Sequence, residues 1–106
     1  MKNNVFYSII VPSYNRKEEI EELLDSFSAL EFPAERFELI IADDGSTDGT
    51  EYLVKDFQKT CGFDLKFYRQ ENRGPGAARN MGMKKARGDF FIFIDSDCTI
   101  APGWLA

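Results

Sequence analysis

The feature that most constrains this chain is an alternation of apolar, extended runs with segments of helical spacing. Apolar runs at residues 5–11, 37–42 and 90–94, and an alternating stretch around Leu65 and Phe67, are typical of four strands. Three amphipathic or small-residue segments between them are typical of helices. Strands that alternate with helices through short links imply a parallel sheet with right-handed crossovers. We therefore predict an α/β fold with one parallel sheet.

Local signals predict where these elements begin and end. Pro12 is expected to end the first strand, and Asn15 begins a capping-box pattern for the first helix, which Pro33 would stop. Asp48 is expected to cap the second helix, with Gly62 as its stop. The sequence thus predicts short, well-punctuated elements.

The last run, 90–94, is apolar throughout, which predicts a central strand. It lies close to residue 106, so we expect further strands beyond it and treat residues 1–106 as the front part of a larger domain. Without such strands its open edge is expected to favour self-association.

Composition excludes several classes of function. The chain has no histidine, which rules out histidine-based triads and histidine-ligated zinc, and Cys61 and Cys98 match no metal or disulfide spacing. The net charge of −5 argues against a nucleic-acid partner. Residues 69–87 nevertheless carry +5, so one segment can receive an anion. We see no secretory signal and expect a cytoplasmic protein, at the inner face of the membrane in full-length form.

Polar residues follow each predicted strand. Because parallel strands bring their carboxyl ends to one edge, where open α/β sheets bind ligands, these residues are expected to lie together. The candidates at this edge are Pro12, Tyr14, Asp43, Asp44, Arg79, Asp95, Ser96 and Asp97.

The residue types at this edge suggest a phosphate ligand and a cation. Asp95 and Asp97 directly follow an apolar strand, and carboxylate oxygens suit Mg²⁺ or Mn²⁺, with water and substrate phosphates as the other ligands. A lone D-x-D is, however, also typical of a solvated turn. Arg79 lies one turn into a helix of small residues, where it can meet a diphosphate with help from the helix dipole.

The second and first loops offer groups for a nucleoside. Asp43 or Asp44 can accept a hydrogen bond from a pyrimidine ring or a ribose hydroxyl, although the pair also suits a turn before a helix. Tyr14 can stack on a base or pack in the core. Both interpretations remain open from these residues alone.

Four segments together identify a family far more specifically than any one of them alone: 11–15, 43–50, 72–80 and 88–97. In order and spacing they resemble the family 2 glycosyltransferases of the GT-A fold, over essentially the whole chain. The resemblance implies a Rossmann-like sheet of order 3-2-1-4 in the nucleotide-sugar-binding, N-terminal half of a GT-A domain. It also implies inverting, metal-dependent transfer of a sugar from a nucleoside-diphosphate donor to an acceptor hydroxyl.

The resemblance assigns roles to the candidate residues. The segment around Pro12 and Tyr14, with Asp44, would hold the base. Three further roles follow: Arg79 near the nucleotide, Asp95 or Ser96 near the ribose, and Asp97 on the Mn²⁺ or Mg²⁺ ion that bridges the diphosphate. The implied partners are a nucleoside-diphosphate sugar, with UDP favoured, and a glycan or lipid-linked acceptor. The general base is expected beyond Ala106, so this chain alone should be inactive.

Three alternatives compete with this interpretation. The first is a module that binds a nucleotide and catalyses nothing. The second is a phosphoryl-transfer enzyme of the haloacid-dehalogenase type, with Asp95 as nucleophile in a D-x-D-x-T motif, although that motif normally lies near the start of a chain. The third, a sugar nucleotidyltransferase, would need a glycine-rich and basic loop after the first strand, which residues 12–16 do not provide.

Overall fold

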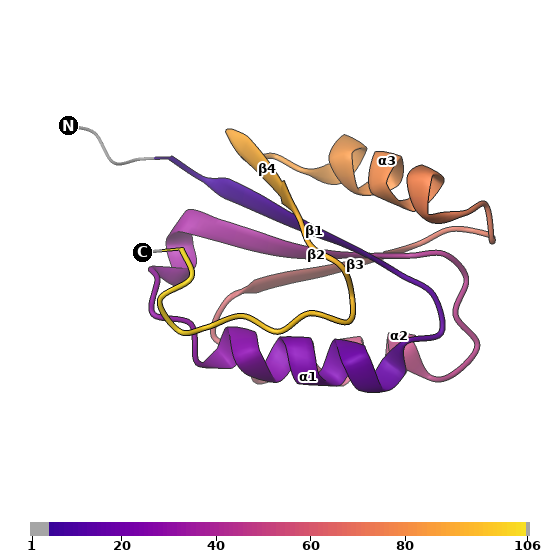
Figure 1. Cartoon of the computed structure of the whole chain (residues 1–106), viewed down its shortest axis with the longest axis horizontal. Helices are drawn as coiled ribbons and strands as arrows, with labels where there is room; N and C mark the ends of the chain where they lie inside the picture. The colour runs from indigo at the N-terminus through magenta and orange to yellow at the C-terminus, as the bar shows by residue number, and fades with distance from the viewer. Residues whose placement is uncertain (1–4, 106) are drawn as a thin grey trace.

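The computed structural model describes residues 5–105 and shows one parallel sheet with helices on both faces (Figure 1). The expected absence of a secretory signal concerns residues outside this range. In chain order the elements are β1 (Tyr7–Ser13), α1 (Lys17–Ser28), the 3₁₀ turn η1 (Ala34–Arg36), β2 (Phe37–Asp43), α2 (Thr50–Gln58), β3 (Asp64–Arg69), α3 (Pro75–Lys85) and β4 (Phe90–Phe93). The four strands lie in the order β3-β2-β1-β4, and every neighbouring pair is parallel. The predicted sheet and strand order are confirmed.

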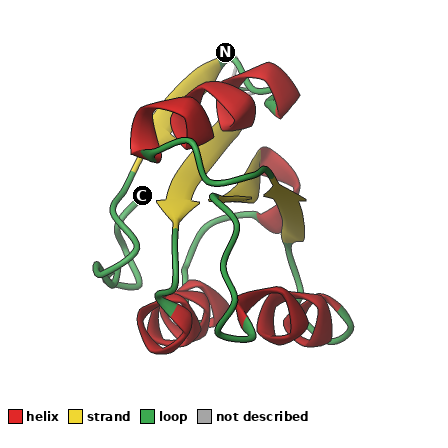
Figure 2. Cartoon of the chain, turned by 90° about the vertical axis from the view of Figure 1, so that its right-hand side faces the viewer, coloured by secondary structure: helices red, strands yellow, loops and turns green. Residues whose placement is uncertain are grey.

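Two helix layers enclose the sheet. Figure 2 shows α1 and α2 on one side and α3 on the other. Ile9 and Val11 point into the core beneath α1 and α2, whereas Ile10, between them, lies against α3. All three are fully buried, because both faces of β1 are covered. This explains why the run has no polar alternation. No helix within residues 5–105 is long and apolar enough to cross a membrane.

The small residues of α3 let this helix lie very close to the sheet. A Cβ atom built on Gly82 would stand 2.6 Å from Cγ2 of Ile10 and 3.5 Å from Cβ of Ala42. Real carbon atoms do not approach to 2.6 Å, so glycine is required at this position. The close packing fixes the height of α3, and therefore of its N-terminus, over β1 and β2.

We expect Gly82→Ala to lower the free energy of unfolding by about 1–3 kcal/mol, the usual range for overpacking, although alanine is the better helix former. Gly76→Ala is the matched control in the same helix, since a Cβ there has nothing within 4 Å. Chemical denaturation of both variants measures the difference. Equal stability of the two would show that α3 is not held at this distance.

Strand β1 continues through Pro12 to Ser13, opposite Ala42 and Asp43 of β2, so the expectation that Pro12 ends it is wrong. The carbonyl of Ile10 accepts the N–H of Ile94, which shows that this side of β1 faces β4. Backbone groups two residues apart in a strand point to the same side, so those of Pro12 also point toward β4, but at a level that lies past the last paired residue of β4. The missing N–H of Pro12 therefore costs no ladder bond.

One loop acid, Asp48, bonds to the first turns of both α1 and α2, which confirms the prediction for α2 and replaces Asn15 at α1. Oδ2 of Asp48 accepts the N–H of Lys17 at 3.0 Å, and Oδ1 accepts the N–H of Thr50 at 3.1 Å. Asp48 thus accepts a backbone N–H from the first turn of each helix. Asn15 does not cap α1: its φ is +50°, and its Oδ1 accepts the N–H of Thr47 at 2.8 Å.

Both helices also end earlier than predicted. Helix α1 stops at Ser28, well before Pro33, because its last turn tightens and the N–H of Ala29 bonds to the carbonyl of Ser26 at 3.2 Å. Helix α2 stops at Gln58, before Gly62. The link after α1 is instead held by the C-terminal segment, where Pro102 accepts the N–H of Glu31 at 2.7 Å.

Within residues 5–105, β4 borders the sheet, as the order β3-β2-β1-β4 requires, and the expectation that it is central in a larger domain stays a prediction. Among the described residues it pairs with β1 alone, and Phe90, Phe91 and Phe93 are 57%, 42% and 42% exposed. Self-association through this edge stays a prediction, and a clean monomer in light scattering at high concentration would contradict it.

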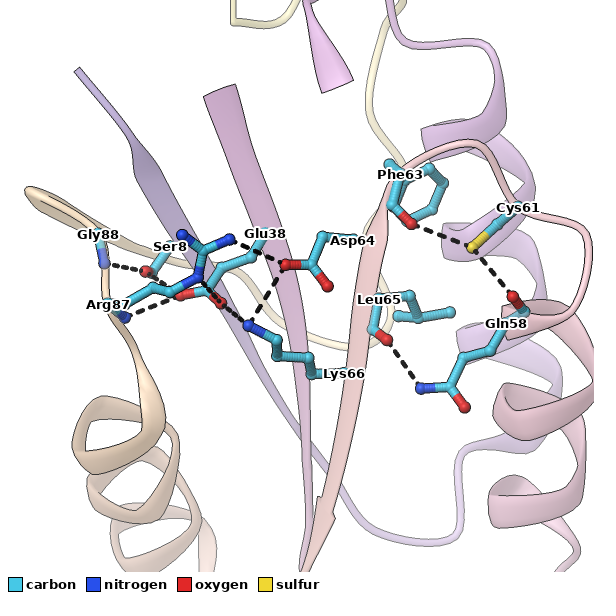
Figure 3. Close-up of polar contacts among 10 residues, drawn as sticks. All are labelled: Ser8, Glu38, Gln58, Cys61, Phe63, Asp64, Leu65, Lys66, Arg87 and Gly88. Carbon is cyan, nitrogen blue, oxygen red and sulfur yellow. Dashed lines mark hydrogen bonds and ion pairs between the residues drawn. The ribbon is translucent and has the colours of Figure 1, made fainter. Parts of the chain in front are cut away.

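A buried acid ties together the end of the sheet opposite the carboxyl ends of the strands (Figure 3). The fully buried Glu38 on β2 accepts hydrogen bonds from Ser8 Oγ at 2.6 Å, Lys66 Nζ at 2.7 Å and the N–H of Arg87 at 2.9 Å. Ser8 Oγ in turn accepts the N–H of Gly88 at 2.8 Å. The network joins three strands to the α3–β4 connection and so fixes where β4 begins.

Candidate functional site

A cavity of about 440 Å³ opens at the carboxyl ends of the strands, beside the N-terminus of α3. Segments that follow all four strands contribute to its wall. The lining residues are Pro12, Ser13, Tyr14, Arg16, Asp44, Asn72, Gly74, Pro75, Ala78, Arg79, Asp95, Ser96 and Asp97. The structure therefore brings together every candidate residue named from the sequence except Asp43.

The loop after β1 turns sharply at Asn15, whose positive φ asparagine tolerates better than most residues. Its N–H donates to Ser46 Oγ at 2.8 Å, which fastens this loop to the one after β2. Tyr14 on one side of the turn and Arg16 on the other both line the cavity. Tyr14 is 45% exposed, so it is a wall residue and not a core aromatic.

Asp43 and Asp44 are neighbours in sequence but have different environments. Asp43 is fully buried, and its carboxylate accepts hydrogen bonds from Ser13 Oγ at 2.9 Å, from the N–H of Gly45 at 3.1 Å and from the N–H of Ser46 at 2.7 Å. These partners are the last residue of β1 and two residues of the turn that follows β2. Asp43 therefore builds the turn, while Asp44 reaches the cavity.

Asp44 is held as a fixed anion in the cavity wall, where its residue is only 4% exposed. Its Oδ1 accepts Gln70 Nε2 at 2.7 Å and the N–H of Arg73 at 2.8 Å, and its Oδ2 accepts the N–H of Gly74 at 3.0 Å. Burial alone would raise the pKa of Asp44, but these three hydrogen bonds lower it below its ordinary value. The carboxylate is thus ionised at neutral pH and can accept a donor from a ligand.

Two exposed carboxylates stand on the cavity wall after β4. Carboxylate oxygens of Asp95 and Asp97 and the Sγ of Cys98 all lie within 4.8 Å of one another. The two hard oxygen donors fit Mg²⁺ or Mn²⁺, ions that take the rest of their shell from water and phosphate. The thiol of Cys98 is a poor ligand for either ion, and Cys98 is not part of the cavity wall. The donor set therefore fits a hard divalent cation that is shared with a phosphate ligand.

Two arginines and a helix end make part of the cavity suitable for an anion. Arg79 lies one turn into α3 and lines the cavity, and the first turn of α3 contains no acidic residue. Among the described residues Arg79 makes no ion pair, so its charge is available. The partial positive charge at the start of α3 adds to it. Arg16 also lines the cavity and pairs with Glu19 at 3.7 Å; it was not among the candidate site residues, although a cation in the segment after the first strand was the signal for it.

Comparison with known proteins identifies the family of this chain. The family model described as "Glycosyl transferase family 2" matches residues 8–106. The poly(ribitol-phosphate) beta-N-acetylglucosaminyltransferase TarS of Staphylococcus aureus is 38% identical over 91 residues, which cover 86% of this chain and 16% of that protein. The uncharacterized glycosyltransferase YfnE of Bacillus subtilis is 44% identical over 100 residues, which cover 93% of this chain and 25% of that protein. This chain thus spans only a small part of the length of these relatives.

Solved structures give the same result. TarS residues 1–349 of S. aureus in complex with UDP-GlcNAc superimposes with a TM-score of 0.84 at 39% identity, covering 92% of this chain and 28% of that one. The mannosyltransferase PcManGT of Pyrobaculum calidifontis, in complex with GDP-Man and Mn²⁺, superimposes with a TM-score of 0.86 at 30% identity, covering 92% and 29%. The fold is that of the GT-A glycosyltransferases, and the chain belongs to glycosyl transferase family 2.

Proposed function

We propose that this chain forms the donor-binding part of an inverting, metal-dependent glycosyltransferase that uses a nucleoside-diphosphate sugar, with UDP favoured. The observation that carries the proposal is the convergence of Asp44, Arg79 and Asp97 on one cavity from three separate segments. Relatives of the same fold were solved with UDP-GlcNAc or with GDP-Man and Mn²⁺. The haloacid-dehalogenase and nucleotidyltransferase interpretations have no comparable support.

The base is proposed to lie against the loops after β1 and β2. The ionised carboxylate of Asp44 accepts an N–H of the base, and the exposed ring of Tyr14 offers a stacking surface beside Pro12. Because Asp44 is already locked by three hydrogen bonds, it needs little reorganisation when the ligand arrives.

The diphosphate is proposed to lie between the acids after β4 and the start of α3. Asp97 would hold Mn²⁺ or Mg²⁺, with Asp95 or Ser96 beside the ribose. When bound, that ion neutralises the charge that develops on the leaving diphosphate. Arg79 and the N-terminus of α3 bind the same phosphates from the other side of the cavity.

The acceptor side of the reaction is proposed to lie on the rest of the full-length protein. Its substrate would be a glycan or a lipid-linked acceptor, at the cytoplasmic face of the membrane, and its general base would be a residue beyond Ala106. This chain alone is therefore expected to bind a donor and to transfer no sugar. Turnover with any acceptor would contradict this division of roles.

Isothermal titration calorimetry with UDP tests the proposal. We expect weak binding in Mn²⁺ or Mg²⁺ that disappears when the ion is chelated with EDTA, because the diphosphate meets two carboxylates that repel it unless a cation lies between them. Binding of equal strength with and without metal would contradict the assignment of Asp97. A thermal-shift screen of nucleotide sugars would then identify the donor.

A further inference from the structure

The hydrogen bonds of Asp44 leave it one well-defined acceptor position. Each carboxylate oxygen can accept about two hydrogen bonds. Oδ1 already accepts two, from Gln70 Nε2 and from the N–H of Arg73, whereas Oδ2 accepts only one, from the N–H of Gly74. The capacity that remains is therefore on Oδ2, in a side chain that lines the cavity.

We propose that Gln70 is a positioning residue that holds Asp44 in this orientation and so makes the site selective for bases that present a ring N–H, uracil or guanine, over cytosine and adenine. This inference rests on the proposed function, because it concerns the nucleotide of that same site. Gln70 lines a neighbouring hollow and not the cavity itself. It therefore acts on a ligand only through Asp44.

The backbone of Gln70 is anchored firmly enough for such a role. Its N–H donates to the carbonyl of Asp43 at 2.9 Å. Gly45, with a φ of +93°, allows the two loops to approach, since a Cβ there would stand 3.2 Å from the carbonyl oxygen of Gln70 and 3.3 Å from the backbone nitrogen of Asn72. With its backbone fixed on both sides, the Gln70 amide reaches Asp44 from a constant position.

The chemistry of the amide suits this task. The amide of Gln70 donates one hydrogen bond to Oδ1 of Asp44 and leaves the open position on Oδ2 to a ligand. The free position on Oδ2 then meets a ring N–H of uracil or guanine. In cytosine and adenine the corresponding ring nitrogen is an acceptor, and two acceptors facing each other in a poorly solvated wall are unfavourable. Sites built on such hydrogen bonds discriminate strongly.

The test compares four ligands that share the same diphosphate: UDP, GDP, CDP and ADP, each titrated by calorimetry in Mn²⁺. For the unchanged chain we expect UDP or GDP to bind at least about tenfold more tightly than CDP and ADP. Gln70→Leu removes the amide donor, lets Asp44 rotate, and should bring this ratio close to one. A general loosening of the fold would weaken all four ligands equally and leave the ratio unchanged.

Gln58→Leu is the matched control, because it removes another glutamine donor, from Gln58 Nε2 to the carbonyl of Leu65 at 2.7 Å, away from the cavity. It should leave the ratio unchanged. If Gln70→Leu fails to fold, Gln70→Lys and Gln70→Glu decide the question: lysine keeps a donor to Asp44 and should retain selectivity, while glutamate places a second carboxylate against it and should lose selectivity.

The outcomes separate the two proposals. If the unchanged chain binds none of the four nucleotides in Mn²⁺, the proposed function fails. If it prefers UDP or GDP and Gln70→Leu keeps the same preference, the function stands and the role of Gln70 is refuted. The same refutation follows if Gln70→Glu is as selective as Gln70→Lys.

Discussion

Replacing Asp97 with alanine is expected to abolish metal-dependent nucleotide binding, with a loss of at least about 100-fold in affinity. That figure is the upper end of what changes to the partners of metal ligands produce, so removing a ligand should exceed it. Asp97 is exposed, and its closest described polar partner is Cys98 Sγ at 4.0 Å from Oδ1, so the fold should not depend on it. Calorimetry with UDP and Mn²⁺ measures the effect.

The matched control is Asp56→Ala, which removes a carboxylate from α2, away from the cavity, whose only described ion pair is with Lys59 at 3.9 Å. It changes the net charge by the same amount and should leave nucleotide affinity unchanged. If Asp97→Ala fails to bind, circular dichroism shows whether the variant is folded. A folded variant that has lost only metal-dependent binding supports a metal ligand, and an unfolded one assigns Asp97 a structural role.

Replacing Glu38 with alanine is expected to lower the free energy of unfolding by about 3 kcal/mol, at the lower end of the range for breaking a buried ion pair, because Lys66 keeps some contact with solvent. The variant also leaves the N–H of Arg87 without its acceptor. Denaturant titration measures this loss, which is a large share of the free energy of unfolding of a whole domain, typically about 5–15 kcal/mol.

Glu51→Ala is the control for this change. Its ion pairs, to Lys55 at 3.9 Å and to Arg69 at 3.6 Å, are solvent-exposed and should contribute less than about 1 kcal/mol. If Glu38→Ala were no more destabilising than Glu51→Ala, the network would not hold the α3–β4 connection as the structure suggests.

The contribution of Glu38 should also depend on pH. Burial would raise the pKa of Glu38, but hydrogen bonds from Arg87, Lys66 and Ser8 lower it below its ordinary 4.5. The contribution of Glu38 to stability is therefore fully present above pH 4.5 and disappears as the pH falls through the lower pKa of the folded state. The hydrogen bond to Glu38 raises the pKa of Lys66 above 10.5. The contribution of Lys66 to stability is therefore present below pH 10.5 and disappears as the pH rises through the raised pKa. The stability difference between the unchanged chain and Glu38→Ala should therefore shrink in acid below 4.5.

The sequence by itself determined the sheet and the edge at which the site lies. The unbroken apolar run around Ile9 and Ile10 required a strand covered on both faces, and Pro75 after a glycine marked the start of a helix, because both signals act within a few residues. Parallel strands then bring their carboxyl ends together, which placed Asp44 and Asp97 on one cavity.

Only the tertiary structure decided which polar residue does what. Asp48 also caps α1, Asp43 binds Ser13 of β1, and Gln70 holds Asp44, and each of these contacts joins residues that are distant in sequence. Within residues 5–105 it also decided how far the rings of β4 are exposed, since burial depends on which elements cover a strand and not on its composition alone. A hydrogen bond forms only when a donor and an acceptor lie about 3 Å apart, and a local sequence pattern does not predict which distant residue the fold brings to that distance.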